Sequence, residues 1–243
     1  MQYIALGAAP GIAICLFIFY KDIYNREPKF NLVLSFILGA LSVVTAIIFE
    51  TFFAATNDGT VMGVALYTFF VVGFSEEGGK FLGLRLYSYS RKSFDDPFDG
   101  IVYSVMVSMG FATLENVLYV TKYAAMGQGW QIGIQRMFLS VPAHASFAVI
   151  MGYFVGKAKF AKTNKTLLMI IGLVGAIFFH GAFDFFLFVG QTGVVSTETG
   201  GALLVGGAIV SFIVALVLSR KLIKAQRLDS KVYFDAQNNS PNV

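Results

Sequence analysis

Long apolar runs separated by short polar segments dominate the hydrophobic pattern of the chain. A transmembrane helix needs about 20 mainly apolar residues, and seven runs are long enough. They cover residues 3–20, 31–54, 61–86, 100–122, 132–155, 167–189 and 201–219. The pattern therefore predicts an all-α membrane protein, a bundle of about seven transmembrane helices with no soluble domain between them.

Basic residues are distributed unevenly among the connecting segments. Fifteen of the 18 lysines and arginines lie in segments 21–29, 85–92 and 157–165 or follow the last span. The alternate connections carry only Lys122 and Arg136, at their edges. Because cytoplasmic loops are enriched in Lys and Arg, we predict that the N-terminus lies outside the cell and the C-terminus in the cytoplasm.

The composition agrees with a membrane protein. Of the 243 residues, 56% are hydrophobic and only 13% are charged, whereas a soluble domain carries about 25% charged residues. The net charge of +4 follows from the loop lysines and arginines, so it does not indicate nucleic-acid binding. We expect residues 1–222 to form one transmembrane domain and residues 223–243 a cytoplasmic tail that is disordered at its end.

Ionisable residues inside the spans are the main indication of function. They are Glu76, Glu77 and Lys80 in the third span, Glu115 in the fourth, His144 in the fifth, and His180 with Asp184 in the sixth. A charge at the bilayer centre costs about 2.5–3.5 kcal/mol, so these groups must meet one another, a cation or a water-filled cavity. From the helical rise per residue, the glutamates and histidines of this group fall within a slab about 10 Å thick, and Asp184 lies one turn further out. We therefore expect one shared polar site.

Helical spacing pairs several of these side chains. Glu76 and Glu77 stand four and three residues before Lys80, so either can form an ion pair with the lysine. We interpret Lys80 as part of a structural ion pair that leaves one glutamate to face a cavity. His180 and Asp184 share a helix face, so the aspartate can orient the imidazole and fix its tautomer.

Other acidic residues receive simpler interpretations. We expect loop and helix-cap roles, rather than roles as metal ligands, for Asp95, Asp96 and Asp99. The pair Asp96-Pro97 is typical of an N-cap followed by the first helical position. Glu50, near the outer end of the second span, is interpreted as interfacial.

Peptide hydrolysis is a reaction that clustered glutamates and histidines can perform. It needs an activated water, a group that stabilises the oxyanion and a proton donor for the leaving amine. Either a glutamate acts on water directly while histidines hold the oxyanion, or Glu115, His144 and His180 bind Zn²⁺. Buried Glu and His also serve as proton relays, so a proton- or ion-coupled transporter and a non-catalytic membrane scaffold remain alternatives.

Four polar motifs stand in order on four consecutive spans. They are E-E-G-G-K (76–80), F-A-T-L-E-N (111–116), P-A-H-A (142–145) and H-G-A-F-D (180–184). These motifs resemble the PrsW family of bacterial membrane proteases and, more distantly, the CAAX-protease superfamily. The likeness covers most of residues 7–190. Glu115 stands where the wider superfamily has a histidine, and His144 can supply that imidazole.

The resemblance implies a multi-pass protease of the bacterial cell membrane. It implies that the enzyme makes the first, site-1 cut in a membrane-anchored anti-sigma factor during a stress response. The expected partners are a single-span membrane protein substrate and the lipid bilayer. By motif, the candidate catalytic residues are Glu76, Glu77, Glu115, His144, His180 and Asp184.

Overall fold

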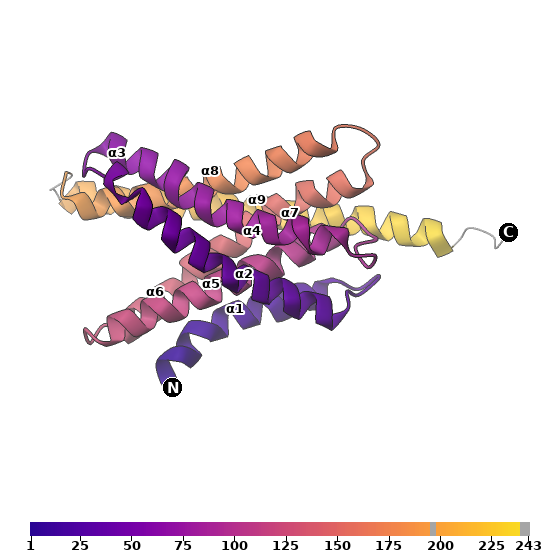
Figure 1. Ribbon diagram of the computed structural model, residues 1–243, viewed down its shortest axis with the longest axis horizontal. Coiled ribbons are helices and arrows are strands. Elements are labelled where there is room, and N and C mark those ends of the chain that lie inside the picture. The colour runs from indigo at the N-terminus through magenta and orange to yellow at the C-terminus, as the bar shows by residue number, and fades with distance from the viewer. Residues whose placement is uncertain (195–197, 239–243) are drawn as a thin grey trace.

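The protein is a bundle of long helices, and the computed structural model describes residues 1–194 and 198–238 (Figure 1). The α-helices are α1 Gln2–Lys21, α2 Lys29–Phe52, α3 Val61–Leu66, α4 Phe74–Leu86, α5 Asp99–Ala124, α6 Gly129–Phe138, α7 Ser140–Phe160, α8 Lys165–Thr192 and α9 Glu198–Asn238. Short helical segments are η1 Ala54–Thr56, η3 Ser88–Ser90 and the π-helical η2 Tyr67–Gly73. No strand occurs among the described residues.

Within the described parts of the chain, seven helical stretches are long and apolar enough to cross a membrane. Five are α1, α2, α5, α8 and α9. The other two are composite: α3, η2, α4 and η3 together form the span Val61–Ser90, and α6 with α7 forms Gly129–Phe160. The predicted number of spans and the all-α class are confirmed, while the orientation in the membrane stays a prediction.

Helix α5 is the centre of the bundle and packs against α1, α2 and α7. Glycines allow the closest approach, between α2 and α5. A Cβ added at Gly39 would collide with the carbonyl of Val107, and one at Gly110 with the carbonyl of Phe36. Because lipid tails are as apolar as the helices, such close backbone packing is a main stabilising contribution in a membrane.

Helix α7 is held against α5 in the same way. Gly152 and Gly156 pack on Gly100 so closely that a side chain at any of the three would meet backbone atoms. The Ser108 hydroxyl of α5 donates a hydrogen bond to the His144 carbonyl of α7, at 3.1 Å. This packing fixes the depth of His144 relative to α5.

The start of α5 differs from the predicted one. We expected Asp96 to cap a helix that begins at Pro97, but the helix begins at Asp99. Asp96 Oδ1 accepts a hydrogen bond from the Phe98 amide at 2.7 Å, and Asp99 Oδ2 accepts from the Asp95 and Asp96 amides, both at 2.8 Å. These carboxylates therefore stabilise the turn before the helix instead of capping its first turn.

The C-terminal region continues as helix. Residues 223–238, expected to belong to a tail, extend α9, and residues 239–243 lie outside the described residues. Gln226 and Ser230 are buried. Gln226 Nε2 donates to the Pro97 carbonyl at 2.5 Å, and Ser230 Oγ donates to Asp96 Oδ1 at 2.7 Å. The end of α9 is thus attached to the segment that precedes α5.

Candidate active site

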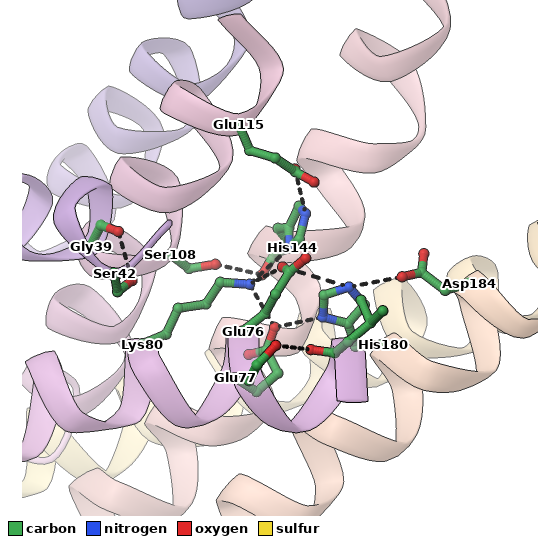
Figure 2. Close-up of polar contacts among 12 residues, drawn as sticks. Gly39, Ser42, Glu76, Glu77, Lys80, Ser108, Glu115, His144, His180 and Asp184 are labelled. Atoms are coloured by element: carbon green, nitrogen blue, oxygen red, sulfur yellow. Dashed lines mark hydrogen bonds and ion pairs between the residues drawn. The ribbon is translucent and has the colours of Figure 1, made fainter. Parts of the chain in front are cut away.

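The structure brings the ionisable residues of the spans together in one polar cluster (Figure 2). Glu76, Glu77 and Lys80 come from α4, Glu115 from α5, His144 from α7, and His180 with Asp184 from α8. Both imidazoles are nearly inaccessible, with exposed fractions of 4% for His144 and 3% for His180.

The ammonium group of Lys80 lies at the centre of this cluster. Its Nζ is 2.7 Å from Glu77 Oε1 and 3.1 Å from Glu76 Oε2. It is also 3.1 Å from His144 Nδ1 and 4.0 Å from the centroid of the Phe111 ring. Lysine therefore pairs with both glutamates at once, whereas the spacing alone allowed either.

Hydrogen bonds assign the two imidazoles different states. An ammonium can only donate, so His144 Nδ1 accepts from Lys80. His144 Nε2 then carries the proton and faces Glu115 Oε2 at 3.3 Å. His180 has the opposite arrangement, because its Nδ1 lies 2.8 Å from Glu77 Oε1 and donates to that carboxylate.

The second nitrogen of His180 faces two other acids. Nε2 is 3.3 Å from Asp184 Oδ2 and 3.8 Å from Glu76 Oε2. With Nδ1–H held by Glu77, the Nε2 lone pair is available for a proton or a metal, as is usual for imidazoles that a carboxylate orients. The predicted pairing of His180 with Asp184 on one helix face is confirmed.

Close packing of the backbone before α4 against α8 explains why His180 lies beside Glu77. A Cβ added at Gly181 would lie 2.6 Å from a ring carbon of Phe69, and one at Gly73 would lie 3.1 Å from the Ile177 carbonyl. Phe69 and Gly73 belong to η2, the π-helical segment that immediately precedes the paired glutamates. π-Helical turns often occur at functional sites. Here the close approach of η2 and α8 sets His180 beside Glu77.

A cavity of about 680 Å³ opens next to the cluster. Its lining includes Glu76, Glu115, Arg136, His144, His180 and Asp184. Glu77 is absent from the lining and has an exposed fraction of 0%. The adjacent glutamates therefore have different surroundings: Glu76 reaches the cavity, and Glu77 lies behind it against Lys80 and His180.

Two further residues that line this cavity, Arg136 and Glu50, are not among the site residues predicted from the sequence. Arg136 Nη2 is 2.5 Å from Glu115 Oε2, and its Nε donates to Asn116 Oδ1 at 2.9 Å. Glu50, interpreted as interfacial, lines the cavity and accepts a hydrogen bond from Ser75 at 3.3 Å. Arg136 falls inside a predicted span, and that position was the signal that could have identified it.

Comparison of the sequence with known proteins identifies the family. The family model described as "PrsW family intramembrane metalloprotease" matches residues 27–219. The chain belongs to the PrsW family. It is 36% identical over 187 residues to Protease PrsW of Shouchella clausii, an alignment that covers 77% of this chain and 84% of that protein. Protease PrsW of Bacillus subtilis is 37% identical over 185 residues, 76% of this chain and 82% of that one. No solved structure matches.

Membership in the family confirms a multi-pass membrane peptidase of bacterial type. A protease of this kind has a protein substrate in the membrane. The matched segment contains every residue of the polar cluster and of the cavity lining. Because the family is described as metalloproteases, the carboxylates and imidazoles of the cluster are candidate metal ligands.

The donor set fits a metal ion of the zinc type. Glu76, Glu77, His144 and His180 each offer one ligand atom, and these four atoms lie within 4.8 Å of one another. Carboxylate oxygens and imidazole nitrogens are common zinc ligands. Glu77 Oε2 is buried and has no hydrogen-bond partner in the part of the chain that the structure describes. Lys80 already bonds three of the four, so a bound cation would compete with the ammonium group.

Glu115 does not belong to this group of four. Its carboxylate lies between Arg136 and His144 Nε2. The prediction that Glu115 is itself a metal ligand is not tested by these contacts and stays a prediction.

Proposed function

We propose that the cavity beside Glu76 is where a peptide bond of a membrane protein is hydrolysed. The observation that carries this proposal is the position of Glu76, His144 and His180, which line one cavity within the spans although they come from three separate helices. A carboxylate and two imidazoles that share a water-accessible space provide the groups that general acid–base hydrolysis needs.

The steps follow from which groups reach the cavity. The Glu76 carboxylate accepts a proton from water as the water oxygen bonds to the carbonyl carbon of the substrate. As the carbon–nitrogen bond breaks, Glu76 returns this proton to the leaving amine, so the proton count balances. The cationic Arg136 and the imidazoles of His144 and His180 surround the place where negative charge develops on the carbonyl oxygen.

Glu77 and Lys80 act through other residues in this proposal. Glu77 holds the Nδ1–H of His180 and so keeps its Nε2 free on the side of Glu76 and Asp184. Lys80 fixes both glutamates and His144. We therefore assign Glu77 and Lys80 as positioning residues.

A metal ion in this site would be held by Glu77, His144 and His180, three of the four residues whose donor atoms lie close together. When bound, Zn²⁺ lowers the pKa of its water towards 7 and polarises a carbonyl group. Glu76 would keep its task of moving the proton, and Glu115 would fix the orientation of His144.

For the substrate, we propose a single-span membrane protein, and specifically the first cut in a membrane-anchored anti-sigma factor. The resemblance of the four motifs to PrsW proteases supports this class of substrate. A site that lies within the spans suits a substrate that the same bilayer holds.

The experiment is cleavage of a single-span anti-sigma factor by the purified protein in liposomes. Glu76→Gln and His180→Ala should lower kcat at least about 100-fold, the usual contribution of a general acid or base. Glu77→Gln should lower cleavage too, because the imidazole loses the carboxylate that orients it. Asp58→Asn, which neutralises an exposed loop residue, is the matched control and should cleave normally.

Two outcomes would contradict the proposal. Absence of cleavage of every single-span substrate by the folded wild type would favour the transporter or scaffold alternatives. Near-normal cleavage by folded Glu76→Gln would move the reaction to another site. A strong chelator separates the two mechanisms, since only the metal-dependent one loses activity and regains it with Zn²⁺.

A further inference from the structure

A second group of buried carboxylates lies away from the active site, where the connection between α1 and α2 meets the segment before α5. Asp22 and Glu27 belong to the connection, Asp96 precedes α5 and Asp99 begins it. Their exposed fractions are only 1%, 3%, 4% and 0%, in that order. A role in loop or cap structure for Asp96 and Asp99 does not explain why four acids share one buried place.

The three aspartates have the separations of cation ligands. One carboxylate oxygen from each of Asp22, Asp96 and Asp99 lies within 4.8 Å of the other two. Bonds from Ca²⁺ to oxygen are 2.3–2.6 Å, so two ligands on opposite sides of that ion are about 4.6–5.2 Å apart. Separations of up to 4.8 Å are therefore compatible with one Ca²⁺ ion shared by the three oxygens. Ligands on opposite sides of Mg²⁺, with bonds of about 2.0–2.1 Å, are about 4.0–4.2 Å apart, so this ion requires shorter separations.

Asp99 provides an independent indication of a missing ligand. Its Oδ2 accepts hydrogen bonds from the Asp95 and Asp96 amides, both at 2.8 Å. Its Oδ1 is buried and has no hydrogen-bond partner among the described residues. Buried polar atoms are nearly always paired, and a cation among these carboxylates would pair this one.

Basic side chains balance the negative charge of the group only in part. No ion pair found within the described parts of the chain, 1–194 and 198–238, reaches any of the four acids. Burial, together with the charge of Asp96, raises the pKa of Asp22 to about 6, and the more distant Arg26 only partly opposes this. Burial also raises the pKa of Glu27 to about 7. A divalent cation would compensate this crowding.

We propose that Asp22, Asp96 and Asp99 form a binding site for a hard divalent cation, Ca²⁺ or Mg²⁺, with the carboxylate of Glu27 beside it. All the donors are oxygens, which these ions prefer over the nitrogen and sulfur ligands of zinc. A bound cation would tie the α1–α2 connection to the start of α5. Through the hydrogen bond from Ser230 to Asp96, it would also hold the end of α9.

The test is a titration of the full-length protein, purified in detergent and freed of metal with a chelator. CaCl₂ and MgCl₂ are added separately, and calorimetry and the unfolding temperature are measured. We expect one cation to bind per chain and the unfolding temperature to rise until that site is saturated. Asp99→Asn should weaken this binding at least about tenfold. Asp95→Asn, which changes an exposed neighbour in the same way, should leave it unchanged.

A second measurement covers the case in which Asp99→Asn does not fold. The Tyr103 hydroxyl donates to the Glu27 carboxylate, so Tb³⁺ in this site should emit when tyrosine is excited, and Ca²⁺ should displace it. Asp22→Asn should abolish this emission. Absence of saturable Ca²⁺ and Mg²⁺ binding tighter than about 10 mM would overturn the proposal. Binding that survives Asp22→Asn but is lost in Glu76→Gln would also overturn it, because the cation would then lie in the active site.

Discussion

Replacing Lys80 with methionine should destabilise the protein more than the same replacement of any other lysine. Methionine keeps most of the side-chain volume and removes the ammonium group. That group contacts Glu76, Glu77 and His144 and is only 2% exposed. Its loss leaves two desolvated carboxylates side by side without a cation.

The expected magnitude comes from this geometry. Removing one partner of a buried ion pair typically costs about 3–5 kcal/mol, because the remaining charge stays buried and uncompensated. Since domain stabilities are about 5–15 kcal/mol, Lys80→Met should lower the folded population sharply without necessarily abolishing folding. Adding Glu77→Gln removes one of the stranded charges, so the double variant should recover about 0.5–3 kcal/mol relative to additivity.

The assay is reversible unfolding of the purified protein in mixed micelles, which gives the free energy of unfolding. Lys122→Met is the matched control. Lys122 lines the cavity beside the cluster, but it is exposed and belongs to no ion pair among the described residues, so its replacement should change stability by about 0.5 kcal/mol or less. A Lys80→Met variant within about 1 kcal/mol of wild type would refute the reasoning, since the carboxylates would then not depend on the ammonium group.

Two further predictions concern topology and packing. Reporter fusions after Lys92 should report a cytoplasmic location and fusions near Asp58 an external one, because of the charge distribution between the connections; the reverse result at either site would contradict the orientation. Gly110→Ala should destabilise the protein by about 1–3 kcal/mol in the same unfolding assay, because its Cβ would enter the backbone of α2. Gly78→Ala is the control and should not destabilise the protein in this way, because its Cβ would meet nothing within 4 Å among the described residues. Equal effects of the two substitutions would argue against the close packing of α2 on α5.

The spans and the existence of the active-site cluster could be predicted from the sequence. Apolar runs identify membrane helices directly, since the bilayer requires a fixed length of apolar chain. The cost of a buried charge also requires residues such as Glu76, Glu115 and His180 to meet. Both inferences follow from the properties of the bilayer, and neither requires knowing which helices are neighbours.

The division of roles within the cluster could not be predicted in this way. Glu76 and Glu77 are adjacent and identical in type, and only the position of α8 decides that Glu77 holds His180 while Glu76 reaches the cavity. The same limit applies to Asp22 and Asp99, which are far apart in the sequence and carry no motif spacing. Their meeting depends on the connection between α1 and α2 folding against the start of α5.

Helix α5 links the two acidic sites and limits how they can influence each other. Asp99 and Glu115 lie 16 residues apart on this helix, which corresponds to roughly 24 Å along its axis. A cation bound at Asp99 therefore cannot contact the active site and can affect cleavage only by moving the helices that it joins, of which α5 carries Glu115. The backbone contacts at Gly39, Gly110 and Gly152 leave little room for such a movement.

We accordingly predict that Asp99→Asn lowers the unfolding temperature clearly but changes kcat by less than about threefold, measured on the fraction that remains folded. A folded Asp99→Asn protein with activity as low as that of Glu76→Gln would show instead that α5 transmits the state of the acidic group to the catalytic carboxylates.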